Sequence, residues 1–91
     1  MKLTAAEVLQ EVLKVEAMTD ERVAKAPTYG VYLHAKDQMI FMKEILQSGR
    51  LPNSEEKGRI DIGIMAVKEL DADEPEYAKA LIFLDCRFEE L

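Results

Sequence analysis

The sequence has 91 residues, of which 48% are hydrophobic and 33% charged, and its formal net charge is −6. This length and balance are typical of a small globular protein, so we expect one domain over residues 1–91. The negative charge argues against nucleic acid and anionic membranes as partners, because both reward clustered Lys and Arg. No stretch reaches the roughly 18 apolar residues that a transmembrane helix needs.

The first residues of the chain do not have the pattern of an export signal. Glu7 and Glu11 interrupt the place where a signal peptide would need an apolar segment, so we expect a cytoplasmic protein. Cys86 is the only cysteine, which excludes an internal disulfide and agrees with a reducing compartment.

A first helix is predicted over residues 5–25. Thr4 and Glu7 have the spacing of a capping box, which predicts that the helix begins directly after Thr4. Pro27 ends this helix or closely follows its end. One stripe of the helix recurs at helical spacing and is expected to face the core, at Val8, Val12, Val15 and Thr19.

A second helix is predicted over residues 29–47, with Thr28 as a candidate N-cap and Ser48-Gly49 as its end. Its apolar seam alternates between spacings of three and four, at Tyr32, Ala35, Met39, Met42 and Leu46. Further apolar residues flank this seam, so the helix is apolar over a wide arc.

A third helix is predicted to start near Asn53 and to end near Leu70, with acidic residues in its first turn. The alternation of residues 60–64 also fits a strand, but that run is short and continues with helical composition, so we choose helix. Ile60, Ile64 and Val67 lie on one face of this helix, which we expect to be the central core helix.

A last helix is predicted to start at Pro75, because proline is favoured at the first helical position. Its apolar residues again recur every three or four positions, at Tyr77, Leu81, Leu84, Phe88 and Leu91. Four helices with short connections indicate an all-α protein, a small four-helix antiparallel bundle.

Groups for catalysis or metal binding are scarce in this sequence. The only histidine, His34, is three residues from Asp37, and a partly exposed, ion-paired histidine is the favoured interpretation over a catalytic one. Cys86 lies in an apolar helix, where a buried inert thiol is the default. Asp71 and Asp73 could begin an EF-hand loop, but its glycine and its final glutamate are absent. We therefore expect neither an enzyme nor a metal or cofactor.

The remaining candidate is a binding surface. Between residues 69 and 90 there are eight acidic residues and two basic ones. Such a run is either a solvated polar face or an acidic patch that steers a basic partner. Tyr29 and Tyr32 could anchor an interface, although Tyr32 could equally be core. The candidate partner-binding residues are Tyr29, Tyr32, Asp37, Glu44, Glu69, Asp71, Asp73, Glu74 and Glu76.

Two groups of residues carry a family resemblance. The first comprises Pro27, Tyr29, Val31, Leu33, Ala35, Lys36 and Gln38; the second comprises Gly63, Ala66-Val67-Lys68-Glu69, Asp71, Pro75-Glu76 and Ala80-Leu81. With these residues the chain resembles the small helical immunity proteins of type VI secretion effectors. Among them it is most similar to those that neutralise an NAD(P)+-glycohydrolase toxin in Pseudomonas. Leu70 departs from the family pattern, where an aromatic residue is usual.

The resemblance implies a cytoplasmic antitoxin that binds the toxin domain of a cognate effector and blocks its nucleotide site. The carboxylates would then meet basic residues around the toxin's nucleotide cleft. The alternative is a non-catalytic structural subunit that forms a homodimer through an exposed apolar arc.

Overall fold

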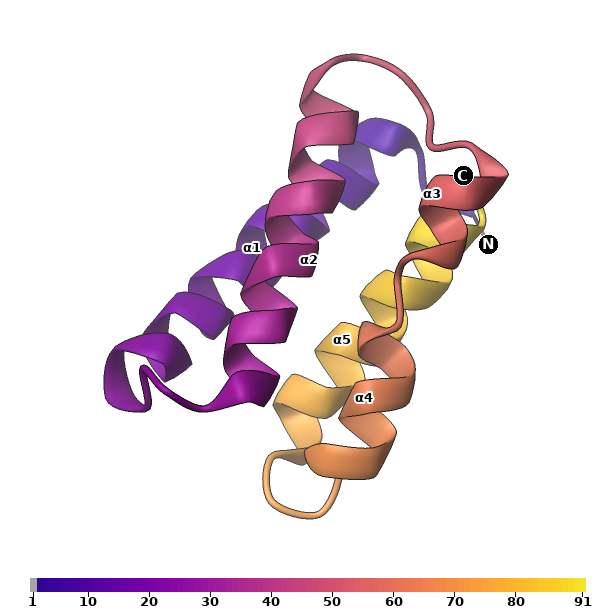
Figure 1. The fold of residues 1–91 in the computed structure, drawn as a ribbon. Coiled ribbons are helices and arrows are strands. Elements are labelled where there is room, and N and C mark those ends of the chain that lie inside the picture. Colours follow the sequence, from indigo (N-terminus) through magenta and orange to yellow (C-terminus); the bar gives the residue numbers. More distant parts are fainter. Residues whose placement is uncertain (1) are drawn as a thin grey trace.

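The computed structural model describes residues 2–91, and the regular structure within that range is helical. Figure 1 shows its elements in chain order, which are α1 (Ala5–Lys25), α2 (Gly30–Gln47), α3 (Ser54–Gly58), α4 (Ile62–Glu69) and α5 (Pro75–Glu89). α1 packs mainly against α2 and α4 mainly against α5, while contacts of α1 with α5 and of α2 with α4 join the two pairs. The four longer helices of the described range therefore form the predicted all-α bundle. None of the described helices is both long and apolar enough to cross a membrane.

Local hydrogen bonds define the start of α1, as the sequence predicts. The Thr4 side chain accepts a hydrogen bond from the Glu7 backbone N–H at 3.2 Å, and the Glu7 carboxylate accepts one from the Thr4 N–H at 2.9 Å. The predicted bounds of this helix are confirmed. So is its predicted core stripe, which is buried at Val8, Val12, Val15 and Thr19.

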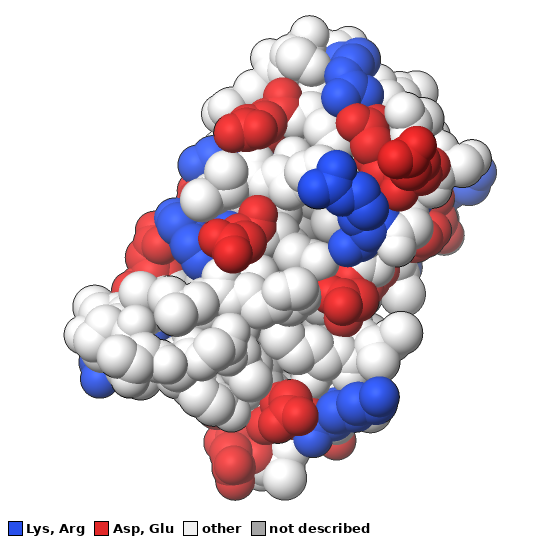
Figure 2. Space-filling model, in the orientation of Figure 1, with Lys and Arg blue, Asp and Glu red and all other residues white. Residues whose placement is uncertain are grey.

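Residues 26–29, which carry no charged side chain, connect α1 to α2, and Figure 2 shows an uncharged area at this corner of the molecule. Tyr29, and not Thr28, takes the N-cap position, so α2 begins at Gly30. The predicted seam is buried at Ala35, Met39, Met42 and Leu46, whereas Tyr32 is only partly buried. After the helix, Gly49 has a φ of 83°, a left-handed conformation that glycine adopts without steric cost.

A buried carboxylate connects α1 to α2. Glu16 is only 8% exposed, and its oxygens lie 2.9 Å from Lys36 Nζ and 2.8 Å from Lys43 Nζ. Burial opposes ionisation of Glu16, but hydrogen bonds from the two ammonium groups outweigh it and hold the pKa below its ordinary value. Because an unpaired buried charge is costly, these two ion pairs favour the register of α1 and α2 that places Glu16 beside both lysines.

The predicted third helix is wrong in one respect, because it is broken into α3 and α4. The side chain of Gln38, on α2, fills the break: its Nε2 donates to the Arg59 carbonyl at 2.8 Å and its Oε1 accepts from the Asp61 N–H at 3.0 Å. These two hydrogen bonds are partly buried and pair backbone groups that the interrupted helix leaves without a helical partner. A group from another helix therefore stabilises a break that local sequence does not specify.

The break changes which face of α4 is buried. Ile62 and Ala66 point into the core, with Leu70 directly after the helix. Ile64 and Val67, which were expected to share a buried face with Ile60, are 62% and 59% exposed. The expectation assumed one continuous helical period, and the non-helical residues 59–61 shift that period.

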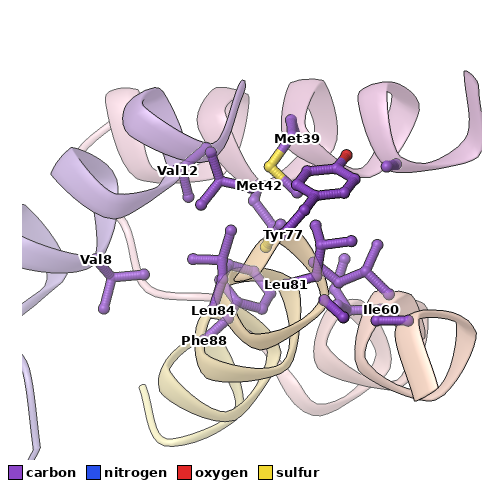
Figure 3. Packing of buried hydrophobic residues seen from close by; sticks show 14 of the residues in the cluster. Val8, Val12, Met39, Met42, Ile60, Tyr77, Leu81, Leu84 and Phe88 are labelled. Atoms are coloured by element: carbon purple, nitrogen blue, oxygen red, sulfur yellow. The ribbon is translucent and has the colours of Figure 1, made fainter. Parts of the chain in front are cut away.

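The core lies between the two helix pairs and is built around α5. Figure 3 shows the buried side chains of α5 packed among those of α1 and α2. Tyr77 is fully buried with its hydroxyl 2.6 Å from Thr19 Oγ1. Thr19 already donates its hydroxyl proton to the Val15 carbonyl at 2.8 Å, so Tyr77 is the donor to Thr19. The predicted seam of α5 is buried at Tyr77, Leu81, Leu84 and Phe88, whereas Leu91 lies beyond the end of the helix and is only partly buried.

Candidate partner-binding surface

Two of the predicted partner-binding residues, Tyr32 and Glu74, bind each other. Tyr32, near the start of α2, donates its hydroxyl proton to Glu74 Oε2, at the N-cap of α5. Arg22, near the end of α1, donates from Nε to Glu74 Oε1 at 2.6 Å. The Arg22 guanidinium also lies over the Tyr77 ring, 4.0 Å from its centroid. This cluster joins the ends of three helices.

The Arg22–Glu74–Tyr32 cluster shifts the pKa values of Tyr32 and Glu74. The hydrogen bond to the Glu74 carboxylate, together with burial, raises the pKa of Tyr32 to about 12. Burial opposes ionisation of Glu74, but hydrogen bonds from Tyr32 and Arg22 outweigh it and lower its pKa. Because the Glu74 carboxylate is satisfied within its own chain, it positions α5 and is not a free acid for a partner.

The other acids of the α4–α5 corner are free. Glu69, Asp71, Asp73 and Glu76 are exposed. Within residues 2–91, none of their side chains takes part in an ion pair or a side-chain hydrogen bond. These four carboxylates, which we call the acidic corner, therefore project into solvent beside the end of α4 and the start of α5.

The remaining predicted residues lie on α2 and just before it. Tyr29 is 41% exposed, and its ring meets that of Tyr32 edge-on, with centroids 4.8 Å apart. Asp37 and Glu44 are exposed and seven residues apart, so they lie on one face of α2. The same face exposes Leu33 and Ile40. Tyr29 lies close to the Glu74 cluster, whereas Asp37 and Glu44 lie farther along α2.

His34 has an acidic partner, as expected, but it is a different residue. Its Nε2 lies 2.6 Å from Asp61 Oδ1, and not against Asp37. Asp61 also accepts a hydrogen bond from Gln38 Nε2 at 2.9 Å. The predicted partner is wrong because the break before α4 brings Asp61 next to α2. His34 thus contributes to the α2–α4 junction.

A groove between α4 and α5 is the feature that sequence reasoning missed. It has a volume of about 390 Å³ and an apolar lining that includes Ile60, Ile64, Val67 and Ile82. Cys86, expected to be buried, is exposed and lies at this groove. In the sequence, the one indication of the groove is the apolar side chain at each lining position, and the helical pattern assigns those side chains to the core.

The described residues do not assemble a catalytic or metal-binding group. No set of three or more His, Cys, Asp or Glu side chains within residues 2–91 is placed to hold a metal ion. His34 is bonded to Asp61 at the α2–α4 junction, while Cys86 lies on the α4–α5 side of the molecule. The surfaces described above are suited to protein binding, through free carboxylates and exposed apolar side chains.

Comparison with known proteins agrees with this arrangement. The sequence model of the Tsi6 family matches residues 4–89, nearly the whole chain. This chain belongs to the Tsi6 family. The chain is 35% identical to the immune protein Tsi6 of Pseudomonas aeruginosa strain PAO1 over 65 residues. These aligned residues are 71% of this chain and 68% of that protein.

The solved structure of Tsi6 from Pseudomonas aeruginosa has the same fold. It superposes with a TM-score of 0.77 at 28% sequence identity, covering 89% of this chain and 83% of that chain. The resemblance seen in the sequence, to the immunity proteins of type VI secretion effectors, is therefore confirmed as membership of the Tsi6 family. Tsi6 proteins are non-catalytic immunity proteins, so membership of the family confirms the expectation that this chain is not an enzyme.

Proposed function

We propose that this protein binds the toxin domain of its cognate type VI secretion effector, an NAD(P)+ glycohydrolase, and blocks the toxin's active site. The match to the Tsi6 family over residues 4–89 carries the proposal. Membership of that family makes the chain an immunity protein of a type VI secretion effector, which requires an effector toxin as its partner. The NAD(P)+ chemistry and the mode of inhibition are our proposal.

The architecture supports tight inhibition by occlusion. A bundle whose core is already packed and whose helix ends are joined by hydrogen bonds loses little conformational entropy when it docks. The Arg22–Glu74–Tyr32 cluster and the Gln38 contacts hold the helices in this way. An inhibitor of this kind needs no chemistry of its own, because filling the nucleotide cleft is sufficient.

The charge distribution supports a partner that is basic around its nucleotide cleft. A site that binds the phosphates of NAD(P)+ presents positive groups, and the free carboxylates of the acidic corner are complementary to them. We propose that the contacts include Tyr29, Asp37, Glu44, Glu69, Asp71, Asp73 and Glu76. Tyr32 and Glu74 support that surface from within, since each is already bonded to the other.

We also propose that the protein acts in the cytoplasm. NAD(P)+ is a cytoplasmic nucleotide pool, so an inhibitor that protects the pool must meet the toxin there. Localisation by fractionation of cells that produce the protein at its native level tests this point. Recovery of the protein outside the cytoplasmic fraction would contradict it.

Co-expression with the toxin domain of the effector encoded beside this gene tests the proposal. We expect the toxin alone to stop growth and to deplete NAD+, and we expect this protein to restore both and to co-purify with the toxin. Toxicity without loss of NAD+ would contradict the proposed chemistry but not immunity. Absence of a complex, together with a dimeric mass for this protein in solution, would favour the structural-subunit alternative.

A further inference from the structure

The groove between α4 and α5 is an apolar surface that the fold leaves uncovered. Ile64 and Val67 are 62% and 59% exposed, the largest exposed fractions among the large hydrophobic side chains of the described residues. They lie three residues apart on α4, hence on one face. Ile82, from α5, lines the opposite side. Two exposed β-branched residues beside a partly buried one around a single hollow are typical of an interaction site and not of scattered surface apolar residues.

One edge of the groove is acidic, and the described residues that line the groove include no Lys or Arg. Asp85 and Glu89 line it, one helical turn apart on α5. Asp85 Oδ2 accepts a hydrogen bond from the Gly63 N–H at 2.8 Å, which places its carboxylate in the groove at the start of α4. Among residues 2–91 neither Asp85 nor Glu89 forms an ion pair. Burial, with the negative charges of Glu89 and Asp61, raises the pKa of Asp85.

This pairing of an apolar floor with an unmatched negative edge selects the kind of occupant. A second copy of the chain would bring its own Asp85 and Glu89 toward these two, and like charges in an interface are costly. A segment with an apolar side chain beside Lys or Arg satisfies both parts of the groove. A toxin domain that is basic around its nucleotide cleft can supply such a segment.

We propose that the α4–α5 groove anchors the toxin domain. An apolar side chain of the toxin packs on Ile64, Val67 and Ile82, and a neighbouring Lys or Arg binds the carboxylates of Asp85 and Glu89. This inference rests on the proposed function and adds the surface that supplies most of the affinity. The acidic corner steers the toxin, whereas the groove holds it, since apolar anchors at the centre of an interface dominate binding energy.

Substitutions that place one negative charge in the groove test the proposal. Isothermal titration calorimetry with the purified toxin domain measures the affinity of each variant. We expect Ile64→Glu and Val67→Glu each to weaken binding by about tenfold or more. Leu51→Glu is the matched control, because Leu51 is 56% exposed in the α2–α3 connection, and we expect it to bind as the unmodified protein does. Melting curves of all three variants should coincide with that of the unmodified protein, because each side chain is exposed.

Cys86 provides a second measurement that needs no substitution. It is the only cysteine of the chain, it is exposed, and it lies at the groove, so its alkylation by a maleimide reports whether the groove is covered. We expect the toxin domain to slow this alkylation strongly, as followed on this chain by mass spectrometry.

The outcomes separate this inference from the proposed function. If the unmodified protein binds the toxin but Ile64→Glu and Val67→Glu bind equally well, or Cys86 stays equally reactive in the complex, the groove is not the anchor. If the unmodified protein dimerises and Ile64→Glu makes it monomeric, the groove is a self-interface and the inference is wrong. If the unmodified protein neither binds nor neutralises the toxin, the proposed function itself fails.

Discussion

The Glu74 carboxylate has two hydrogen-bond donors within its own chain, and this decides its role. Its sequence context, a proline flanked by acids, is that of an exposed acidic turn. Its actual partners are Arg22 and Tyr32, which come from two other helices. A carboxylate in such a cluster determines where α5 begins relative to α1 and α2. Charge reversal at Glu74 would therefore disturb the fold as well as any interface.

Replacement of Glu74 by Gln is expected to lower the pKa of Tyr32 from about 12 toward its ordinary value of 10.0. The hydrogen bond to the carboxylate is the main cause of the shift, and the amide is neutral. A raised pKa means that the folded state holds the phenol proton more tightly. The stability it contributes is therefore complete below pH 10.0 and is lost as the pH rises through about 12.

Titration of tyrosinate absorbance measures this shift, with Glu76→Gln as the control for an exposed acid of the same turn. The control should leave the alkaline titration unchanged. An unaltered titration in Glu74→Gln would show that the Tyr32–Glu74 hydrogen bond does not set the phenol pKa.

At the scale of elements, the break between α3 and α4 depends on one amide side chain from α2. Gln38 serves as both donor and acceptor for the backbone of residues 59–61 and is only 8% exposed. We expect Gln38→Leu to destabilise the protein by about 1–3 kcal/mol, because two partly buried hydrogen bonds to the backbone are lost. Urea unfolding measures the loss.

Hydrogen exchange of the Asp61 amide adds a local measurement to this prediction, since Gln38→Leu should accelerate it selectively. Gln47→Leu, at an exposed position on the same helix, is the control and should change stability little. Equal stability of the two variants would contradict the role assigned to Gln38.

The start of α4 is capped from another helix, and this explains why Gly63 is a glycine. Asp61, the N-cap residue, makes no capping hydrogen bond, and Asp85 on α5 accepts from the Gly63 N–H instead. A Cβ at Gly63 would lie 2.9 Å from Asp85 Oδ2 and 3.2 Å from its Cβ and Cγ. The carboxylate could make room only by giving up the hydrogen bond.

We therefore expect Gly63→Ala to destabilise the protein despite the better helix propensity of alanine. Gly30→Ala is the control, because nothing lies within 4 Å of the added Cβ, and it should stabilise by about 0.5–1 kcal/mol. In an Asp85→Ala background, Gly63→Ala should change from destabilising to stabilising. A double-mutant cycle by chemical denaturation measures this, and additive effects would contradict the proposed cap.

For the molecule as a whole, the net charge of −6 is expected to govern the rate at which it meets a basic toxin. We expect Asp71→Lys with Asp73→Lys to slow association by about tenfold at low salt and to change dissociation little, because these exposed carboxylates act at long range. The effect should diminish as salt rises. Stopped-flow mixing with the toxin domain measures both rates.

The control variant for this measurement is Glu11→Lys with Glu55→Lys, which alters the net charge equally but away from the acidic corner. If both double variants slow association to the same extent, net charge alone steers the toxin. The acidic corner would then have no special part in the encounter.

Much of the fold could be predicted because its determinants are local. The capping box at Thr4, the spacing of the apolar seams and Pro75 at the start of α5 each act within a few residues. The exposed acidic corner was predicted for the same reason, since a short polar turn has few ways to be buried.

The structure alone decided which polar residues bind each other and which apolar residues stay outside. Glu74 accepts hydrogen bonds from Arg22 and Tyr32, and His34 contacts Asp61, only because helices that are distant in the sequence pack together. Gln38 breaks the third helix from across the bundle, which turns Ile64 and Val67 outward, and the same packing leaves the α4–α5 groove open at Cys86. The amino-acid sequence by itself determined the capped start of α1, the start of α5 and the acidic corner, because these depend on neighbouring residues. Side chains from non-adjacent helices determined the break, the cluster and the groove, so these features exist only in the assembled bundle.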